Sequence, residues 1–153
     1  NITPNASSRI YDDKGRLITT VHAEENRIPV PISQVPQNLQ NAFVAAEDVR
    51  FYEHHGVDPR GILRAVFANL TSGNATGQGG STITQQLARN AFLTQEQTLK
   101  RKLLEVVLAF EIESKYTKKQ ILEMYMNQIY FGQGCYGIQT AAHVYFGKDV
   151  KDL

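Results

Sequence analysis

The sequence predicts a mainly α-helical domain with a short β-element at its N-terminus. Its 153 residues are 42% hydrophobic and 20% charged, which is typical of a globular chain long enough for one core. From residue 37 onward, apolar residues recur at three- and four-residue spacing, whereas the earlier residues carry short β-favouring runs. We therefore divide the chain into an extended or β-hairpin segment, residues 1–36, and a helical core, residues 37–153.

The N-terminal segment has the pattern of a small hairpin. Two short runs, Ile10–Tyr11 and Leu17–Val21, flank the turn-forming sequence Asp12-Asp13-Lys14-Gly15. Prolines then follow at positions 29, 31 and 36. Because proline fixes its own φ and keeps the preceding residue out of the helical region, this stretch is expected to run extended.

Capping residues predict where the helices of the core begin. A first helix is expected over residues 37–48, and Asp58 followed by Pro59 is typical of an N-cap and a first helical residue. Thr followed three residues later by Gln forms a capping-box pattern, which predicts a helix start. The pattern occurs at Thr82/Gln85, Thr94/Gln97 and Thr117/Gln120. A further helix is expected over residues 137–145, after a glycine-rich break.

Charge and hydropathy exclude several classes of protein. Lys and Arg number 16 against 15 for Asp and Glu, so the formal charge of +1 argues against a general nucleic-acid binder. No apolar run approaches the ~20 residues that a membrane-spanning helix needs. The lone cysteine, Cys135, is interpreted as a small buried residue.

Residues 47–56 gather three acids, two histidines and two aromatic residues. A carboxylate in such a cluster is a candidate for proton transfer. On residue types alone, however, a polar helix end followed by a turn is favoured. A metal site using His54, His55 and Asp58 is disfavoured, because adjacent histidines do not lie on one helical face.

A glycine-rich loop, residues 77–80, leads into the helix expected after Thr82. Helix N-termini present free N–H groups and a positive dipole end, which favour phosphate, and glycine lets the backbone approach a ligand closely. The loop is not a Walker A sequence, because no Gly-Lys-Ser/Thr follows. A phosphate site and a plain linker are about equally supported by this stretch alone.

Two later helices carry further charged candidates. Arg101, Lys102 and Glu105 have the spacing of helical ion pairs, which contribute at most ~0.5 kcal/mol on a surface. Glu105 lies between leucines and valines, so this acid needs a partner or a function. Lys118 opens the next helix and can reach an anion, although a solvated surface position is favoured.

Taken in order, these segments resemble the motifs of the family 51 peptidoglycan glycosyltransferases. That family includes monofunctional transglycosylases and the N-terminal domains of class A penicillin-binding proteins. Its motif Glu-Asp-x-x-Phe-x-x-His-x-Gly is matched over residues 47–56, and Gly-x-Ser-Thr-Ile-Thr-Gln-Gln over residues 79–86. Arg-Lys-x-x-Glu is matched over residues 101–105, and Lys-x-x-Ile-Leu-x-x-Tyr-x-Asn over residues 118–127. Four long motifs in the family's order are a specific signal.

The resemblance implies a lysozyme-like helical fold and the polymerisation of lipid II, a disaccharide-pentapeptide on undecaprenyl pyrophosphate. The acceptor sugar's 4-hydroxyl attacks the donor's anomeric carbon, with inversion and release of undecaprenyl pyrophosphate. Glu47 matches the base of this reaction, and Glu105 matches the second essential acid. The residues expected to bind substrate are Asp48, Phe51, His54, Gly80, Ser81, Thr82, Gln85, Gln86, Arg89, Arg101, Lys102, Lys118 and Asn127.

The resemblance also implies partners and a location. The expected partners are lipid II, the growing glycan strand and the membrane surface; a moenomycin-type inhibitor is an expected ligand, other cell-wall synthesis proteins stay open, and no nucleic acid is expected. The expected location is the outer face of the bacterial cytoplasmic membrane, with the anchor on a segment missing from this chain. No metal site is assigned, and a divalent cation, Mg²⁺ or Mn²⁺, stays open as a cofactor.

Three departures from the family pattern leave alternatives open. Arg89 stands where members often have Lys, Gln97 stands where many have Arg, and an Arg-Arg-containing fifth motif is missing. We therefore expect the core to be truncated at its C-terminus. One alternative is a truncated, non-catalytic fragment that binds a lipid pyrophosphate, and another is a lysozyme-like glycan hydrolase.

The helix expected after Pro59 has two interpretations. The family places this neighbourhood close to the membrane, and the apolar residues over 62–70 beside Arg60 and Arg64 suit an interfacial helix. An ordinary amphipathic core helix is favoured by the pattern alone.

Overall fold

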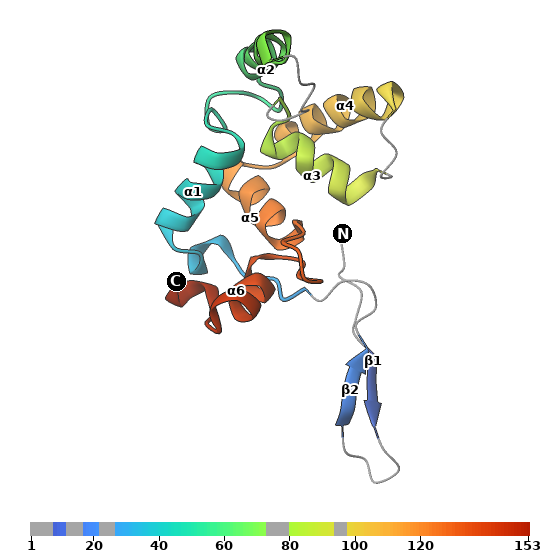
Figure 1. Ribbon diagram of the computed structural model, residues 1–153, viewed down its shortest axis with the longest axis vertical. Coiled ribbons are helices and arrows are strands. Elements are labelled where there is room, and N and C mark those ends of the chain that lie inside the picture. Colours follow the sequence, from blue (N-terminus) through green and yellow to red (C-terminus); the bar gives the residue numbers. More distant parts are fainter. Residues whose placement is uncertain (1–7, 12–16, 22–26, 73–79, 94–97) are drawn as a thin grey trace.

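The computed structural model describes residues 8–11, 17–21, 27–72, 80–93 and 98–153 (Figure 1). The described part is mainly helical, and a short β-element precedes the helices. The predicted fold class is therefore confirmed.

The β-element is a two-stranded antiparallel sheet. Strand β1, Ser8–Tyr11, pairs with β2, Leu17–Val21, and Ser8 lies opposite Val21. This pairing confirms the predicted hairpin, although its turn at residues 12–16 lies outside the described residues. In Figure 1 the strand pair lies apart from the helices. After residue 27 the chain runs without regular structure to a short 3-10 helix, η1, Ile32–Gln34, as the prolines predicted.

Six α-helices follow, with a second 3-10 helix near the end of the chain, among the residues that the structure describes. Their bounds are α1 Gln37–Glu47, α2 Pro59–Ser72, α3 Ile83–Phe92, α4 Leu99–Lys115, α5 Lys118–Gln128, α6 Ile138–Phe146 and η2 Val150–Asp152.

Most of the predicted helix starts are confirmed. Asp58 caps α2, since its Oδ1 accepts a hydrogen bond of 3.1 Å from the Arg60 backbone. Thr82 and Thr117 form complete capping boxes at α3 and α5. The start of α4 differs from the prediction, because its N-cap is Thr98 and not Thr94. The predicted Thr94/Gln97 pair itself lies outside the described residues.

Helix α5 lies at the centre of the core, between α1, α3 and α6 (Figure 1). Four of its side chains are fully or almost fully buried: Ile121, Leu122, Tyr125 and Met126. They pack with buried apolar residues of α3 and of the loop after α1, among them Ile83, Leu87 and Phe51. Cys135 is also buried and free, as predicted.

The segment before α1 is held to α5 by side-chain hydrogen bonds. Asn127 forms two of them with Val30: its Oδ1 accepts from the Val30 N–H at 2.9 Å, and its Nδ2 donates to the Val30 carbonyl at 2.8 Å. The Glu123 carboxylate accepts from the Ile32 N–H at 2.7 Å. These bonds pair backbone N–H and C=O groups of an extended segment that has no neighbouring strand.

Helix α2 presents apolar side chains to solvent. Leu63 is 69% exposed and Phe67 is 73% exposed. These two residues are therefore not part of the core, although the sequence pattern favoured an amphipathic core helix here. Among the residues that the structure describes, no helix is both long and apolar enough to cross a bilayer.

Candidate active site

Glu47 is the last residue of α1 and is exposed to solvent. Its Oε2 accepts a hydrogen bond of 3.0 Å from Nε2 of Gln86, which lies on α3. The side-chain amide oxygen of Gln86, Oε1, in turn accepts a hydrogen bond of 3.0 Å from the Tyr125 hydroxyl on α5. The carboxylate is therefore solvent-accessible and also oriented by two helices other than its own.

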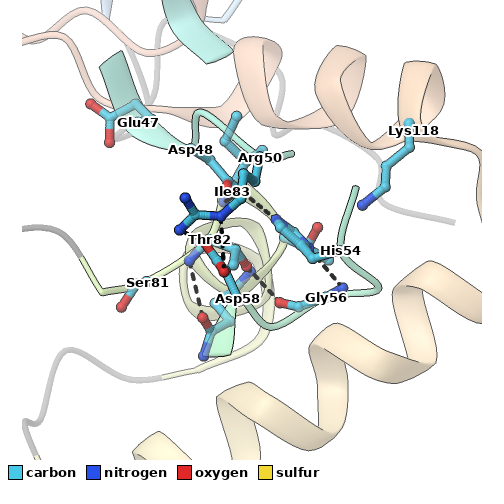
Figure 2. Close-up of polar contacts among 12 residues, drawn as sticks. Glu47, Asp48, Arg50, His54, Gly56, Asp58, Ser81, Thr82, Ile83 and Lys118 are labelled. Carbon is cyan, nitrogen blue, oxygen red and sulfur yellow. Dashed lines mark hydrogen bonds and ion pairs between the residues drawn. The ribbon is translucent and has the colours of Figure 1, made fainter. Parts of the chain in front are cut away.

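Asp48, the next residue, has a different environment. It is buried, and its Oδ2 accepts hydrogen bonds from His54 Nε2 at 2.7 Å and from the Ile83 N–H at 3.1 Å (Figure 2). Ile83 is the first residue of α3, so the carboxylate lies at the positive end of that helix. Asp48 therefore joins the end of α1 to the start of α3 and fixes where Glu47 is presented.

His54 and Gly56 extend this connection. The Gly56 N–H donates to His54 Nδ1 at 3.1 Å, so Nδ1 is an acceptor and Nε2 carries the proton that Asp48 accepts. The Thr82 hydroxyl donates to the Gly56 carbonyl at 2.6 Å. Gly56 has φ +100°, and a Cβ there would lie 3.1 Å from the Ala109 carbonyl group, which explains the need for glycine.

Arg50 and Asp58 form an ion pair that sequence reasoning did not assign to the site. Nη2 of Arg50 lies 2.6 Å from Oδ2 of Asp58, the residue that caps α2. Burial would raise the pKa of the Asp58 carboxyl, but hydrogen bonds from Arg50 and from the backbone of Gly61 and Arg60 outweigh burial and lower this pKa below its ordinary value. The pair therefore fixes the start of α2 relative to the loop that follows α1.

The second acid, Glu105, lies on α4 and is completely buried. Its Oε1 accepts from Lys102 Nζ at 2.7 Å, and the same Nζ donates to the Ser81 hydroxyl at 2.6 Å. Its Oε2 is buried and has no hydrogen-bond partner within the described part of the chain. The second and third motifs thus meet at Lys102, which lies between a serine and a buried carboxylate.

Ser81 and Glu47 line one shallow pocket, together with Gly80 and Arg64. Arg64 comes from α2, and the sequence indicated it only as part of a membrane-facing helix. Thr82 and Gln85 are buried and form the capping box that holds the start of α3. The rest of the glycine-rich loop, residues 77–79, lies outside the described residues.

Other predicted site residues make contacts elsewhere. Lys118 Nζ lies 2.7 Å from the Glu113 carboxylate and 4.6 Å from the centroid of the Phe51 ring. In Figure 2, Lys118 and Glu47 lie on opposite sides of the Asp48–His54 pair. Phe51 is fully buried. The Asn127 side chain bonds to backbone atoms: to Val30, as described above, and to the Glu123 carbonyl, to which its Nδ2 donates at 3.0 Å.

The remaining cations lie on the helices that form the site. Arg89, on α3, is close enough to Tyr125 to affect the pKa of its hydroxyl, and Arg101 lies in the first turn of α4 beside Lys102. Both side chains are partly buried. Within the described ranges, no group of three or more His, Cys, Asp or Glu residues is placed to hold a metal ion.

The structure is thus a helical domain with a pocket that is lined by an exposed acid, Glu47, and by Ser81 just before α3. Lys102 of α4 bonds to Ser81 and to the buried acid Glu105. The chain belongs to the Transglycosylase family, whose model matches residues 14–153. This match confirms the family resemblance found in the four motifs.

Curated relatives are close in sequence but much longer. Penicillin-binding protein 1F of Bacillus subtilis is 51% identical over 97% of this chain. Penicillin-binding protein 1A of Escherichia coli is 56% identical over 95% of the chain, and that of Aquifex aeolicus is 52% identical over 99%. The chain spans 21%, 17% and 20% of these three proteins, respectively.

Proposed function

We propose that this chain is a peptidoglycan glycosyltransferase domain that polymerises lipid II by inverting transfer and releases undecaprenyl pyrophosphate. The observation that carries the proposal is that Glu47 and Ser81 line one pocket, and that Lys102 bonds to both Ser81 and Glu105. Membership of the Transglycosylase family supports the reaction class.

Glu47 is suited to the role of base. A carboxylate has only acceptor sites, so it can take the proton of a sugar hydroxyl placed at its free oxygen. Its exposure leaves room for the acceptor sugar, and the Gln86 hydrogen bond limits its orientation. In the proposed step the acceptor's 4-oxygen bonds to the anomeric carbon, the bond from that carbon to pyrophosphate breaks, and the hydroxyl proton goes to Glu47.

The other end of the pocket is suited to the departing pyrophosphate. Charge develops on its bridging oxygen, and donors that are already in place stabilise such charge best. Lys102, held between Ser81 and Glu105, is one such donor, and Arg64, which lines the same pocket, adds positive charge. Glu105 is suited to holding Lys102 in place and not to contact with solvent, because it is fully buried.

The proposed substrate is lipid-linked, so the site would operate at a membrane surface. The exposed apolar residues of α2, Leu63 and Phe67, together with Arg60 and Arg64, support contact of this helix with a lipid surface. We place the domain at the outer face of the bacterial cytoplasmic membrane, where a lipid-linked donor and the glycan strand would both be reachable.

The test is polymerisation of fluorescent lipid II in detergent by the parent chain, Glu47→Gln and Glu53→Gln. Glu53 is the matched control because it is an exposed acid in the same segment, and its substitution makes the same chemical change. Polymer from the parent and from Glu53→Gln, but not from Glu47→Gln, is the expected result. Polymer from Glu47→Gln at the parent rate would contradict the assignment of the base.

Two further readouts separate the alternatives. If the parent makes no polymer but binds a moenomycin-type ligand, the non-catalytic lipid-pyrophosphate-binding alternative is favoured. If the parent shortens finished glycan strands without lipid II, and Glu47→Gln does not, the hydrolase alternative is favoured.

A further inference from the structure

We propose that Tyr125 is a positioning residue for the base: its hydroxyl fixes the Gln86 amide, and that amide holds the Glu47 carboxylate in its working orientation. The inference rests on the proposed role of Glu47. It concerns a residue whose hydroxyl bonds to Gln86 and not to the carboxylate, and which lies on a third helix, α5.

The direction of each hydrogen bond follows from the partners. One end of the Gln86 amide faces two acceptors, the Glu47 carboxylate at 3.0 Å and the Ser81 carbonyl at 3.5 Å. That end must therefore be the NH₂ group, and the other end must be the carbonyl. The Tyr125 hydroxyl, 3.0 Å from this carbonyl, can then only donate.

Tyr125 is well suited to hold the amide in that orientation. Its side chain is fully buried, and its ring packs edge-on against Phe43 with centroids 6.4 Å apart. Burial raises the pKa of the phenol well above its ordinary value, and the Glu47 carboxylate adds to this effect whereas Arg89 opposes it. The hydroxyl therefore stays protonated at neutral pH and remains a donor.

Glu47 needs such support because its own surroundings give little. It is exposed at the C-terminal end of α1, where a glutamate side chain keeps much of its rotamer freedom. Within the described residues, the bond from Gln86 is the one hydrogen bond of its carboxylate. A base that samples several rotamers spends only part of its time at the distance needed for proton transfer.

The kinetic test is a double-variant cycle with Tyr125→Phe and Gln86→Met. Tyr125→Phe keeps the buried ring and removes only the hydroxyl. We expect its kcat for lipid II polymerisation to fall about fivefold to tenfold, with KM and the unfolding midpoint close to the parent's. In the Gln86→Met background the same substitution is expected to have no further effect, since Gln86 carries its influence.

The matched control is Tyr145→Phe, which also removes a hydroxyl that donates a hydrogen bond, to the Phe131 carbonyl at 2.8 Å. Tyr145 lies on α6, away from the pocket, and its substitution should leave kcat unchanged. The proposal is overturned if Tyr125→Phe keeps the parent kcat, or if it lowers kcat equally with and without Gln86.

A second measurement does not depend on activity. Crystal structures of the parent and Tyr125→Phe should show one position for the Glu47 carboxylate in the parent, and a rotated Gln86 amide with a displaced carboxylate in the variant. An unchanged Glu47–Gln86 hydrogen bond in the variant would overturn the positioning role. If the Glu47 carboxylate is displaced in the variant but the parent never polymerises lipid II, the positioning role of Tyr125 is supported and the proposed function is rejected.

Discussion

The two acids of the site lie in opposite environments. Glu47 is exposed at the end of α1 and is held by one neutral amide, whereas Glu105 is completely buried on α4 and is paired with Lys102. An exposed carboxylate can exchange a proton with a ligand, but a buried and paired one mainly orders its neighbours. This difference supports the proposed division of roles, in which Glu47 is the base and Glu105 holds Lys102 in position.

The largest effect that we expect from the contrast between Glu47 and Glu105 is on the activity of a Glu47 variant. Glu47→Gln keeps the shape and the contact with Gln86 but removes the base, so we expect the polymerisation rate to fall about 10³-fold. The free energy of unfolding, measured with urea, should change by no more than about 0.5 kcal/mol because the side chain is exposed. A loss of stability that matches the loss of rate would break the contrast.

The next effect is an asymmetry within the Lys102–Glu105 pair. Lys102→Met leaves a fully buried carboxylate without a charged partner and should lower the free energy of unfolding by about 3 kcal/mol. Glu105→Gln leaves a lysine that is 42% exposed and can be hydrated, so its effect should be about 1 kcal/mol. Lys115→Met, at the exposed pair with Glu111, is the control and should change stability by less than about 0.5 kcal/mol. Equal losses for the first two variants would contradict the burial argument.

A smaller loss of stability is expected for Asp48→Asn. Both hydrogen bonds go to one oxygen, so the amide oxygen of the new side chain can replace it, but the negative charge that strengthens both bonds at the positive end of α3 is lost. The free energy of unfolding should therefore fall by about 1.5 kcal/mol. Asp152→Asn, at an exposed residue of η2, serves as the control in the same urea titration. A variant as stable as the parent would show that Asp48 does not hold α1 to α3.

The smallest effect is a pH dependence at Asp58. Its pKa is lowered in the folded chain, so its contribution to stability is present above the unfolded value of about 4 and is lost as the pH falls through the folded value. Asp58→Asn should therefore lower the free energy of unfolding by about 1 kcal/mol at pH 7. The difference from the parent should shrink below about pH 4 in urea titrations over a pH series. A difference that persists unchanged in acid would show that the effect does not come from the charge of Asp58.

Local signals explain what the sequence could predict about the fold. The caps at Asp58, Thr82 and Thr117 depend on residues within three or four positions, so they are visible in the sequence. The same rule failed at α4, because Thr98 has Arg101 three positions later and lacks the glutamine that completes the box. The family motifs then indicated which segments form the candidate site.

The roles within each motif could not be read from the sequence. Glu47 and Asp48 are adjacent acids, yet one is exposed and the other buried, because only Asp48 meets the start of α3. Tyr125 and Asn127 belong to one motif, but they face α3 and the segment before α1, respectively. These differences depend on contacts between residues 35 to 97 positions apart, which no local pattern contains.

The hydrogen bonds between Val30 and Asn127 have a consequence for biosynthesis. The chain emerges from the ribosome N-terminus first, so the segment around Val30 must wait for 97 further residues before its partner exists. Until then its backbone groups are unpaired, and the buried face of α5 against which it packs has not been made. Docking of this segment is thus a late event, and a chain interrupted before Asn127 would keep it open to proteases and to aggregation.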